Sequence, residues 1–270
     1  MDLKPVRKTA FMDLQNCPRK FEYFYFKDPA YWDYGAKGEK VNEAEALVKG
    51  NLFHDNAETF FKKMDLTHAI DLNDDRIKHY FRTLLPTGTT IDPWFDYFAN
   101  FEANRFISEK NEIGDQVLTD YKPFLTEQEM KWDDGNIVRT GHIDRLDLFK
   151  AENAYCVVEY KTGKSYDMNK KFPLSKMRLE TAWYAAMINN NKEMKYPAHY
   201  WACINPTLGQ VTVEKFHSLT LASLERKVAK MYEAMKNGGP FPRNLSILCN
   251  WCKYRKDCLF NNKDYIIGRT

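Results

Sequence analysis

The chain has 270 residues, of which 44% are hydrophobic and 29% are charged, a composition typical of a folded globular protein and not of a disordered one. The longest unbroken apolar run, Ala182 to Ile188, is far too short to span a bilayer, and no apolar stretch follows the first basic residues, as a secretory signal would require. We therefore expect an intracellular protein, in the cytoplasm or, if a virus encodes it, in the host cytoplasm, with no membrane partner.

Helical periodicity dominates the first half of the chain, a strand-rich section follows, and helices return near the end. The helix expected between two of the strands supplies a crossover connection, so the pattern predicts an α/β or α+β sheet surrounded by helices. Helices are predicted at 9–25, 42–63, 74–84 and 93–110, strands at 122–131, 137–149 and 154–161, a helix at 174–190, strands at 198–204 and 210–216, and a last helix at 219–236.

A histidine lies in the second predicted helix, in the sequence Gly50-x-x-x-His54, with Glu58 one helical turn beyond it. An imidazole is a suitable ligand for Mn²⁺ as well as Mg²⁺ beside carboxylates, and Glu58 could orient it. Alternatively, a lone histidine at this spacing is an ordinary core or surface residue.

The strands at the centre of the chain form a predicted hairpin. A turn centred between Ala151 and Glu152 places residue i opposite residue 303 − i, which sets Asp144 opposite Glu159. Lys161 lies two residues beyond Glu159 and therefore on the same face. Two carboxylates and a lysine can hold a divalent cation and orient a water for phosphodiester hydrolysis. The alternative is an ion cluster on the solvent side of an ordinary hairpin, because a slip of one residue reverses the faces.

Basic residues are concentrated just after this hairpin, where Asp167 is their only acidic neighbour. The segment is suited to binding a polyanion, although a solvated lysine-rich loop and helix face would give the same pattern. Its basic residues are Lys161, Lys164, Lys170, Lys171, Lys176 and Arg178.

Four of the six cysteines form a candidate metal site. Cys249, Cys252 and Cys258 follow a C-x2-C-x5-C spacing, and Cys17 near the other end of the chain would supply a fourth thiolate. By spacing alone, structural zinc and an iron-sulfur cluster are equally compatible, and free structural thiols are the remaining alternative.

These motifs, in this order along nearly the whole chain, resemble the RecB-like branch of the PD-(D/E)XK nuclease superfamily. The closer resemblance is to its iron-sulfur members, the CRISPR-associated adaptation exonucleases and the AddB-type nuclease domains. The motifs are Cys17-Pro-Arg-Lys-Phe, Gly50-x-x-x-His54, Gly141-x-x-Asp144-Arg145, Glu159-Tyr-Lys161-Thr-Gly-Lys164 and the C-terminal cysteines. The resemblance implies a restriction-endonuclease-like α/β core with a mixed central sheet flanked by helices, a helical N-terminal part and a 4Fe-4S cluster.

Roles follow from the resemblance residue by residue. It implies that Lys161 is the catalytic lysine, that the four cysteines ligate the cluster, and that His54, Asp144, Glu159 and the backbone carbonyl of Tyr160 bind Mg²⁺ or Mn²⁺. One motif departs from the family pattern: Glu180-Thr-Ala-Trp-Tyr184 stands where relatives have Gln-x-x-x-Tyr. An ionised glutamate cannot donate a hydrogen bond and repels phosphate, so Glu180 either pairs with a basic neighbour such as Lys161 or adds to the metal site.

The resulting expectation is a single nuclease domain over 1–270. The 4Fe-4S cluster staples 1–30 to 245–260, a helical insertion takes 63–116, and the catalytic core takes 117–217. We expect a metal-dependent DNA exonuclease that prefers single-stranded ends and serves recombination and repair, CRISPR adaptation or viral DNA processing. A helicase or another protein of these pathways would be its partner.

We expect the strand to be held by Lys164, Lys170, Lys171 and Arg178, with aromatic residues between Phe21 and Phe26 either stacking on bases or forming core. Two rival hypotheses remain. One is an inactive iron-sulfur module that binds nucleic acid or serves as a scaffold, and the other is a zinc-stapled endonuclease.

Overall fold

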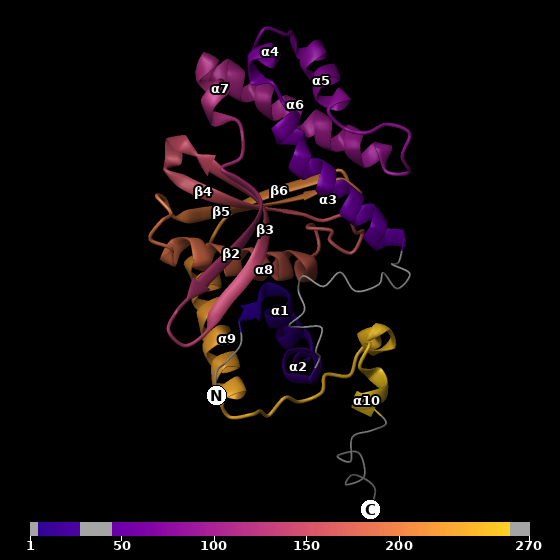
Figure 1. Ribbon diagram of the computed structural model, residues 1–270, viewed down its shortest axis with the longest axis vertical. Coiled ribbons are helices and arrows are strands. Elements are labelled where there is room, and N and C mark those ends of the chain that lie inside the picture. Colours follow the sequence, from indigo (N-terminus) through magenta and orange to yellow (C-terminus); the bar gives the residue numbers. More distant parts are fainter. Residues whose placement is uncertain (1–4, 28–44, 260–270) are drawn as a thin grey trace, which may run out of the picture. The chain divides into compact units, whose positions relative to one another are not determined.

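The computed structural model describes residues 5–27 and 45–259 (Figure 1). The chain divides into two compact units. One takes 1–40, 131–141 and 222–270, and the other takes 41–130 and 142–221. The second unit contains every residue predicted for the catalytic site, and the first contains the four cysteines of the predicted staple.

The strands form a mixed sheet in the order β1-β3-β4-β5-β6, with β2 paired to β3. The β3–β4 pair is antiparallel, with Arg145 opposite Val158 and Phe149 opposite Ala154, so the predicted 303 − i register is confirmed. The β4–β5 pair is parallel because α8 (Lys171–Asn190) carries the chain back across the sheet, and β5–β6 is antiparallel. The strands are β1 (Val6–Arg7), β2 (Leu125–Asp133), β3 (Val138–Phe149), β4 (Ala154–Tyr160), β5 (Ala198–Asn205) and β6 (Gln210–Lys215).

A helical region at 45–120, wider than the insertion predicted at 63–116 and called the helical insertion from here on, covers one face of β4 and β5. Cys156, Val158 and Tyr160 alternate along β4 and enter one buried cluster with aromatic residues of this insertion, among them Phe53 and Phe98. The helices are α3 (Glu45–Lys63), α4 (Leu66–Ile70), α5 (Asp74–Thr83), α6 (Asp92–Ile113) and α7 (Val117–Asp120), with short 3₁₀ turns at Gly114–Gln116 and Lys150–Glu152.

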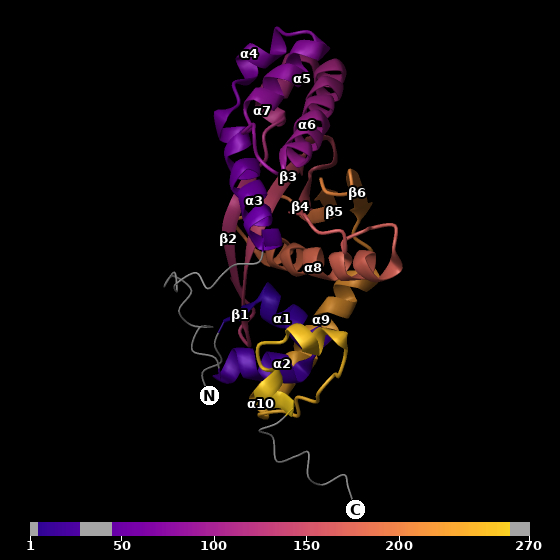
Figure 2. The same cartoon turned by 90° about the vertical axis from the view of Figure 1, so that its right-hand side faces the viewer.

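Helix α8 packs against β4 and β5, and Figure 2 shows it on the other side of these strands from the insertion. The helix is buried without interruption from Glu180 to Ile188, which is why this stretch, after Glu180 and Thr181, is apolar all round instead of amphipathic. The predicted α/β class with a mixed sheet flanked by helices is confirmed.

The other unit contains both ends of the described chain. The predicted helix at 9–25 is broken at Cys17, whose backbone is extended (φ −155°) because Pro18 opens the next helix and disfavours helical geometry in the residue before it. Its elements are α1 (Lys8–Asn16), α2 (Pro18–Glu22), a π-helical turn (Tyr23–Lys27), α9 (Ser218–Lys236), a 3₁₀ turn (Ile247–Trp251) and α10 (Arg255–Leu259).

The aromatic residues of this N-terminal segment belong to the core. Phe21 and Tyr25 are fully buried, and the Phe21 ring lies 5.8 Å from that of Phe241, centroid to centroid. Of the two alternatives, core packing is therefore correct for Phe21 and Tyr25, and neither can stack on a nucleobase.

Two further differences from the predicted elements concern short helices. The first predicted strand, at 122–131, is preceded by the one-turn helix α7, and neither this helix nor α4 and α10 were predicted, because helices of four or five residues show no periodicity. Among the described residues, no helix is long and apolar enough to cross a membrane.

Candidate metal centre and catalytic site

The β3–β4 hairpin places the predicted carboxylates beside each other. The register extended by one residue beyond the Arg145–Val158 pair sets Asp144 opposite Glu159. The backbone N–H of Tyr160 donates to Asp144 Oδ2 at 2.8 Å, which fixes the orientation of this carboxylate. The Glu159 side chain is only 1% exposed, so the pair is not an ion cluster on the solvent side of the sheet. Buried carboxylates need charged partners, and the rest of the site supplies them.

Lys161 follows directly after β4 and lies between two glutamates. Its backbone N–H donates to the Ile204 carbonyl at 3.0 Å, and its Nζ lies 2.7 Å from Glu159 Oε2 and 3.1 Å from Glu180 Oε2. Burial lowers the pKa of Lys161, but the neighbouring carboxylates outweigh burial and hold the pKa well above its usual value. In this state the residue is a cation, suited to orienting water and offsetting phosphate charge and not to removing a proton.

Helix α3 positions His54 beside Asp144. A Cβ added at Gly50 would lie 3.1 Å from Thr162 Oγ1, so glycine lets the helix approach the loop that follows Lys161. His54 Nδ1 lies 3.4 Å from Glu127 Oε1 and 3.9 Å from Asp144 Oδ1. Burial lowers the pKa of His54, but these two carboxylates more than offset that effect, and the net pKa is raised.

Glu127, on β2, is a site residue that the sequence reasoning missed. Its carboxylate lies between two imidazoles, with Oε2 3.0 Å from His142 Nδ1. Its φ of +45° lies in the left-handed region, which a non-glycine residue adopts at a cost and which is often found at functional sites. Glu129, two residues away, is exposed, and the sequence contains no signal that separates the two glutamates.

Glu127, and not Glu58 as suggested from the sequence, lies beside the imidazole of His54. Glu58 forms an ion pair with Lys62 one turn along α3, so the carboxylate that orients His54 comes from β2 and not from the histidine's own helix.

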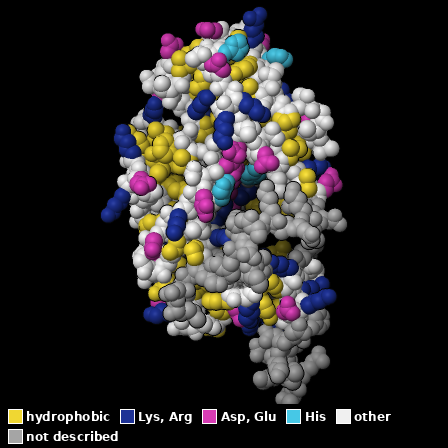
Figure 3. All heavy atoms as spheres, viewed as in Figure 1, with side chains coloured by type: hydrophobic (Ala, Val, Ile, Leu, Met, Phe, Trp, Pro, Cys, Tyr) yellow, Lys and Arg dark blue, Asp and Glu magenta, His cyan; other side chains and the backbone are white. Residues whose placement is uncertain are grey.

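A divalent cation fits this donor set. In the part of the chain that the structure describes, His54, Glu127 and Asp144 are the one group of three metal-binding side chains whose ligand atoms all lie within 4.8 Å of one another. One imidazole nitrogen with carboxylate oxygens suits Mg²⁺ and, still better, Mn²⁺. The structure thus brings His54 and Asp144 together as predicted, whereas the Glu159 carboxylate is outside this group and pairs with Lys161. Figure 3 shows acidic and histidine side chains gathered near the middle of the face on which α3 lies.

Helix α8 contributes Glu180 and Tyr184 at helical spacing. Glu180 pairs with Lys161 and, at 3.6 Å, with Lys176, so of the two alternatives the structure contains the pairing with a basic neighbour. The buried Tyr184 hydroxyl donates to the His142 carbonyl, two residues before Asp144. Tyr184 therefore ties α8 to β3 close to Asp144.

The predicted DNA-binding residues differ in their surroundings. Lys164, Lys170 and Lys171 are exposed, and Lys170 has only a loose pair with Asp167 at 3.6 Å. Arg178 instead donates two hydrogen bonds to Glu214, at 2.7 and 2.8 Å, so its charge is already engaged.

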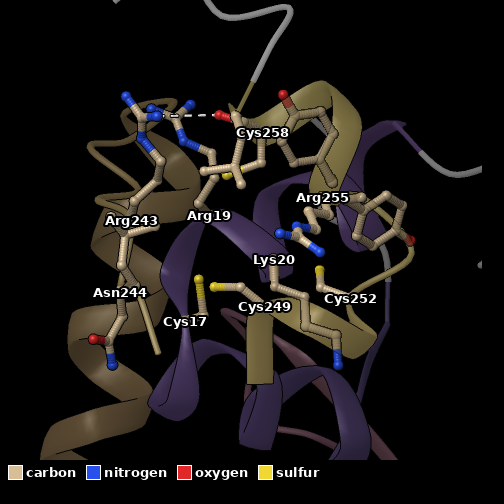
Figure 4. Close-up of a pocket in the computed structure, with 13 residues that line it drawn as sticks. Cys17, Arg19, Lys20, Arg243, Asn244, Cys249, Cys252, Arg255 and Cys258 are labelled. Carbon is tan, nitrogen blue, oxygen red and sulfur yellow. Dashed lines mark hydrogen bonds between the residues drawn. The ribbon is translucent and has the colours of Figure 1, made fainter. Parts of the chain in front are cut away.

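The four candidate cysteines line one pocket in the other unit, together with basic side chains (Figure 4). Burial raises the pKa of the Cys258 thiol, the nearby thiols of Cys17 and Cys252 add to this effect, and Arg243 and Arg19 oppose it. Four thiols among cationic groups fit an anionic metal–thiolate centre. No three of the four described sulfurs lie within 4.8 Å of one another, so they are spread more widely than the ligand atoms around His54.

Hydrogen bonds of the polypeptide itself join the two ends of the described chain at this pocket. Asn244 Nδ2 donates to the Asn16 carbonyl at 2.8 Å, and the Arg19 N–H donates to the Pro242 carbonyl at 3.2 Å. The Tyr23 and Tyr254 rings stack at 5.4 Å between centroids. These contacts hold Cys17 beside the C-terminal cysteines.

A mixed sheet that presents two carboxylates on adjacent strands, Asp144 within β3 and Glu159 near the end of β4, together with a lysine and an imidazole from a neighbouring helix, is suited to phosphodiester chemistry. The family model of the PD-(D/E)XK nuclease superfamily matches residues 9–259, and the chain belongs to this superfamily. Among solved structures, the crystal structure of SSO0001 matches at 13% identity and a TM-score of 0.37, covering 94% of this chain and 85% of that one. No curated protein matches the chain.

Proposed function

We propose that this protein is a metal-dependent DNA exonuclease. The observation that carries the proposal is the convergence of His54, Glu127 and Asp144 within 4.8 Å, beside the Glu159–Lys161 pair and in a chain of the PD-(D/E)XK nuclease superfamily. The superfamily implies a nucleic acid substrate. The exposed lysines of the segment after β4 support a polyanionic strand near the site.

His54, Asp144, Glu159 and the backbone carbonyl of Tyr160 would hold Mg²⁺ or Mn²⁺, with Glu127 orienting His54 or serving as a further ligand. Such an ion, when bound, lowers the pKa of water and offsets charge on a phosphate. Lys161 donates hydrogen bonds toward the water and the phosphate, and Glu159 and Glu180 hold its ammonium group in place. Tyr184, on α8, keeps β3 in position because its hydroxyl donates a hydrogen bond to the His142 carbonyl.

We further propose that Cys17, Cys249, Cys252 and Cys258 hold a 4Fe-4S cluster, as in the iron-sulfur members of the RecB-like branch. Support comes from their single pocket and from the basic side chains that line it. A zinc ion would draw four sulfurs to about 3.8 Å from each other, given a Zn–S length of about 2.3 Å, whereas a cubane cluster keeps its thiolates farther apart. Iron and sulfide analysis of anaerobically purified protein tests this proposal, and a colourless protein containing zinc refutes it.

Preference for single-stranded ends belongs to the same proposal. The described lysines of the segment after β4 offer phosphate contacts, and a helicase or another protein of recombination, CRISPR adaptation or viral DNA processing would supply the strand. The staple and the catalytic unit together would form one nuclease over 1–270.

End-labelled single-stranded and duplex DNA, incubated with Mn²⁺, Mg²⁺ or EDTA, tests the activity. We expect metal-dependent shortening from an end that is lost in Lys161→Ala and kept in the matched control Lys215→Ala, a lysine outside the site. Internal cuts without end-shortening would refute the exonuclease assignment. Retained DNA binding without cleavage at any metal concentration would favour the scaffold hypothesis, in which Glu180 holds Lys161 unproductively.

A further inference from the structure

One exposed aromatic residue lies at the start of the helix that leads into the site. Phe172, in the first turn of α8, is 74% exposed, the highest exposure among the large hydrophobic residues that the structure describes. A single exposed apolar side chain is common on protein surfaces. Phe172 differs from such residues in two ways. Exposed lysines precede it, and Glu180, on the same helix, contacts the catalytic lysine, Lys161.

Phe172, Lys176 and Glu180 are spaced four residues apart and therefore lie along one face of α8. Exposure falls steadily along this row: Phe172 is 74% exposed, and the side chains of Lys176 and Glu180 are 27% and 7% exposed. Glu180 then contacts Lys161 at 3.1 Å. The row thus runs from solvent to the catalytic lysine, over about 12 Å of helix, the length of a few nucleotides.

The charges around this row match a nucleic acid backbone. Lys170 and Lys171 immediately precede Phe172 and are exposed, and Lys164 is exposed in the loop before them. The Lys176 ammonium group is held by Glu180 and by the Tyr166 hydroxyl at 3.3 Å, and it lies 5.0 Å from the centre of the Tyr166 ring. An aromatic face among exposed lysines is the combination that binds single strands, with stacking for bases and cations for phosphates.

We propose that Phe172 is a stacking platform for a base of single-stranded DNA, a few nucleotides from the phosphate at Lys161, and that the α8 face from Phe172 to Glu180 guides the strand. This inference rests on the proposed function and adds a specific contact to it. Because Phe172 is distant from the reacting atoms along α8, it sets the affinity and register of the strand and not the chemistry.

The test measures binding of a short single-stranded oligonucleotide that carries 2-aminopurine at one position, moved stepwise along the strand, with EDTA present to prevent cleavage. The wild type should quench 2-aminopurine at one position near an end. Phe172→Ala should lose that quenching and bind about tenfold more weakly, since stacking of one base on an aromatic residue is worth about 1–3 kcal/mol. Phe172→Trp should keep both properties because it retains an aromatic face.

Leu219→Ala provides the matched control, since Leu219 is also apolar and is 67% exposed, and its removal should change neither property. Wild-type binding and cleavage that persist unchanged in Phe172→Ala would overturn this inference and leave the nuclease proposal standing. A wild type that binds no single strand would overturn this inference and the proposed preference for single-stranded ends, whereas the nuclease proposal is decided by the cleavage assay. An equal loss of affinity for Phe172→Ala and Phe172→Trp would also refute stacking.

Discussion

Replacing Glu127 by glutamine should weaken divalent metal binding without unfolding the protein. The carboxylate is within 3.4 Å of His54 and 3.0 Å of His142, and the amide keeps the shape of the side chain while removing its charge. Loss of a group that orients a metal-binding histidine typically lowers metal affinity 10- to 100-fold, or about 1.4–2.7 kcal/mol. Titration calorimetry with Mn²⁺, on wild type and Glu127→Gln, measures the difference.

The same variant should change the titration of His54. In the metal-free wild type, burial lowers the pKa of His54 and the two carboxylates raise it further than burial lowers it. A raised pKa in the folded state contributes stability below the ordinary histidine pKa of about 6.5, and this contribution is lost as pH rises through the raised value. Glu127→Gln should lower the pKa of His54 and shrink this pH dependence. Imidazole NMR shifts in metal-free protein report the pKa directly.

The backbone at Glu127 supplies a control that separates strain from charge. Because its φ is +45°, Glu127→Gly should be more stable than Glu127→Ala by about 1 kcal/mol, whereas both should lose metal affinity equally. Unchanged Mn²⁺ affinity and an unchanged His54 pKa in Glu127→Gln would refute the role given to this residue.

Three further perturbations test other parts of the structure. Gly50→Ala should reduce metal-dependent cleavage severalfold, because its Cβ meets Thr162 Oγ1 at 3.1 Å, and Thr162→Ala in the same chain should restore the rate; failure of this rescue would show that the contact is unimportant. Glu102→Gln should lower the free energy of unfolding in urea by about 1.5–3 kcal/mol, because the buried Arg145 guanidinium loses one of its two carboxylate partners and keeps only Asp147. Burial raises the pKa of Glu102, but its arginine neighbours lower the pKa by more than burial raises it. The stability of the wild type should therefore fall as pH drops through this lowered pKa, and Glu102→Gln should lack this loss. Equal acid sensitivity of the wild type and Glu102→Gln would contradict this prediction. Cys17→Ala should remove iron and lower the melting temperature, and unchanged iron content would rule out ligation by this residue.

Local signals were sufficient for most of the fold. The polar link at 150–153 fixed the hairpin register, because a short turn leaves few ways to pair the strands that flank it, and the predicted register holds up to the Arg145–Val158 pair, directly beside Asp144 and Glu159. The break at Cys17 was missed because helical periodicity runs through it, although the proline that follows is a recognised boundary signal.

The part of the site that sequence reasoning missed depends on long-range packing. Glu127 approaches His54 because of how β2 and α3 pack, and no spacing along the chain encodes that approach. The same is true of Phe172, whose exposure depends on which part of α8 the sheet covers. The Glu180–Lys161 pair is one of the two alternatives that the sequence left open for Glu180, and charge alone could not choose between them.

Whether Asp144 binds the divalent cation that cleavage needs is decided by the Mn²⁺ dependence of end-labelled DNA cleavage by wild type and Asp144→Asn. Asparagine can still accept the 2.8 Å hydrogen bond from the Tyr160 N–H, so the hairpin is kept while the metal-binding charge is removed. We expect a rate that saturates with Mn²⁺ in the wild type and no cleavage at any Mn²⁺ concentration in the variant. Cleavage by Asp144→Asn at the wild-type rate, or wild-type cleavage that persists in EDTA, would contradict it.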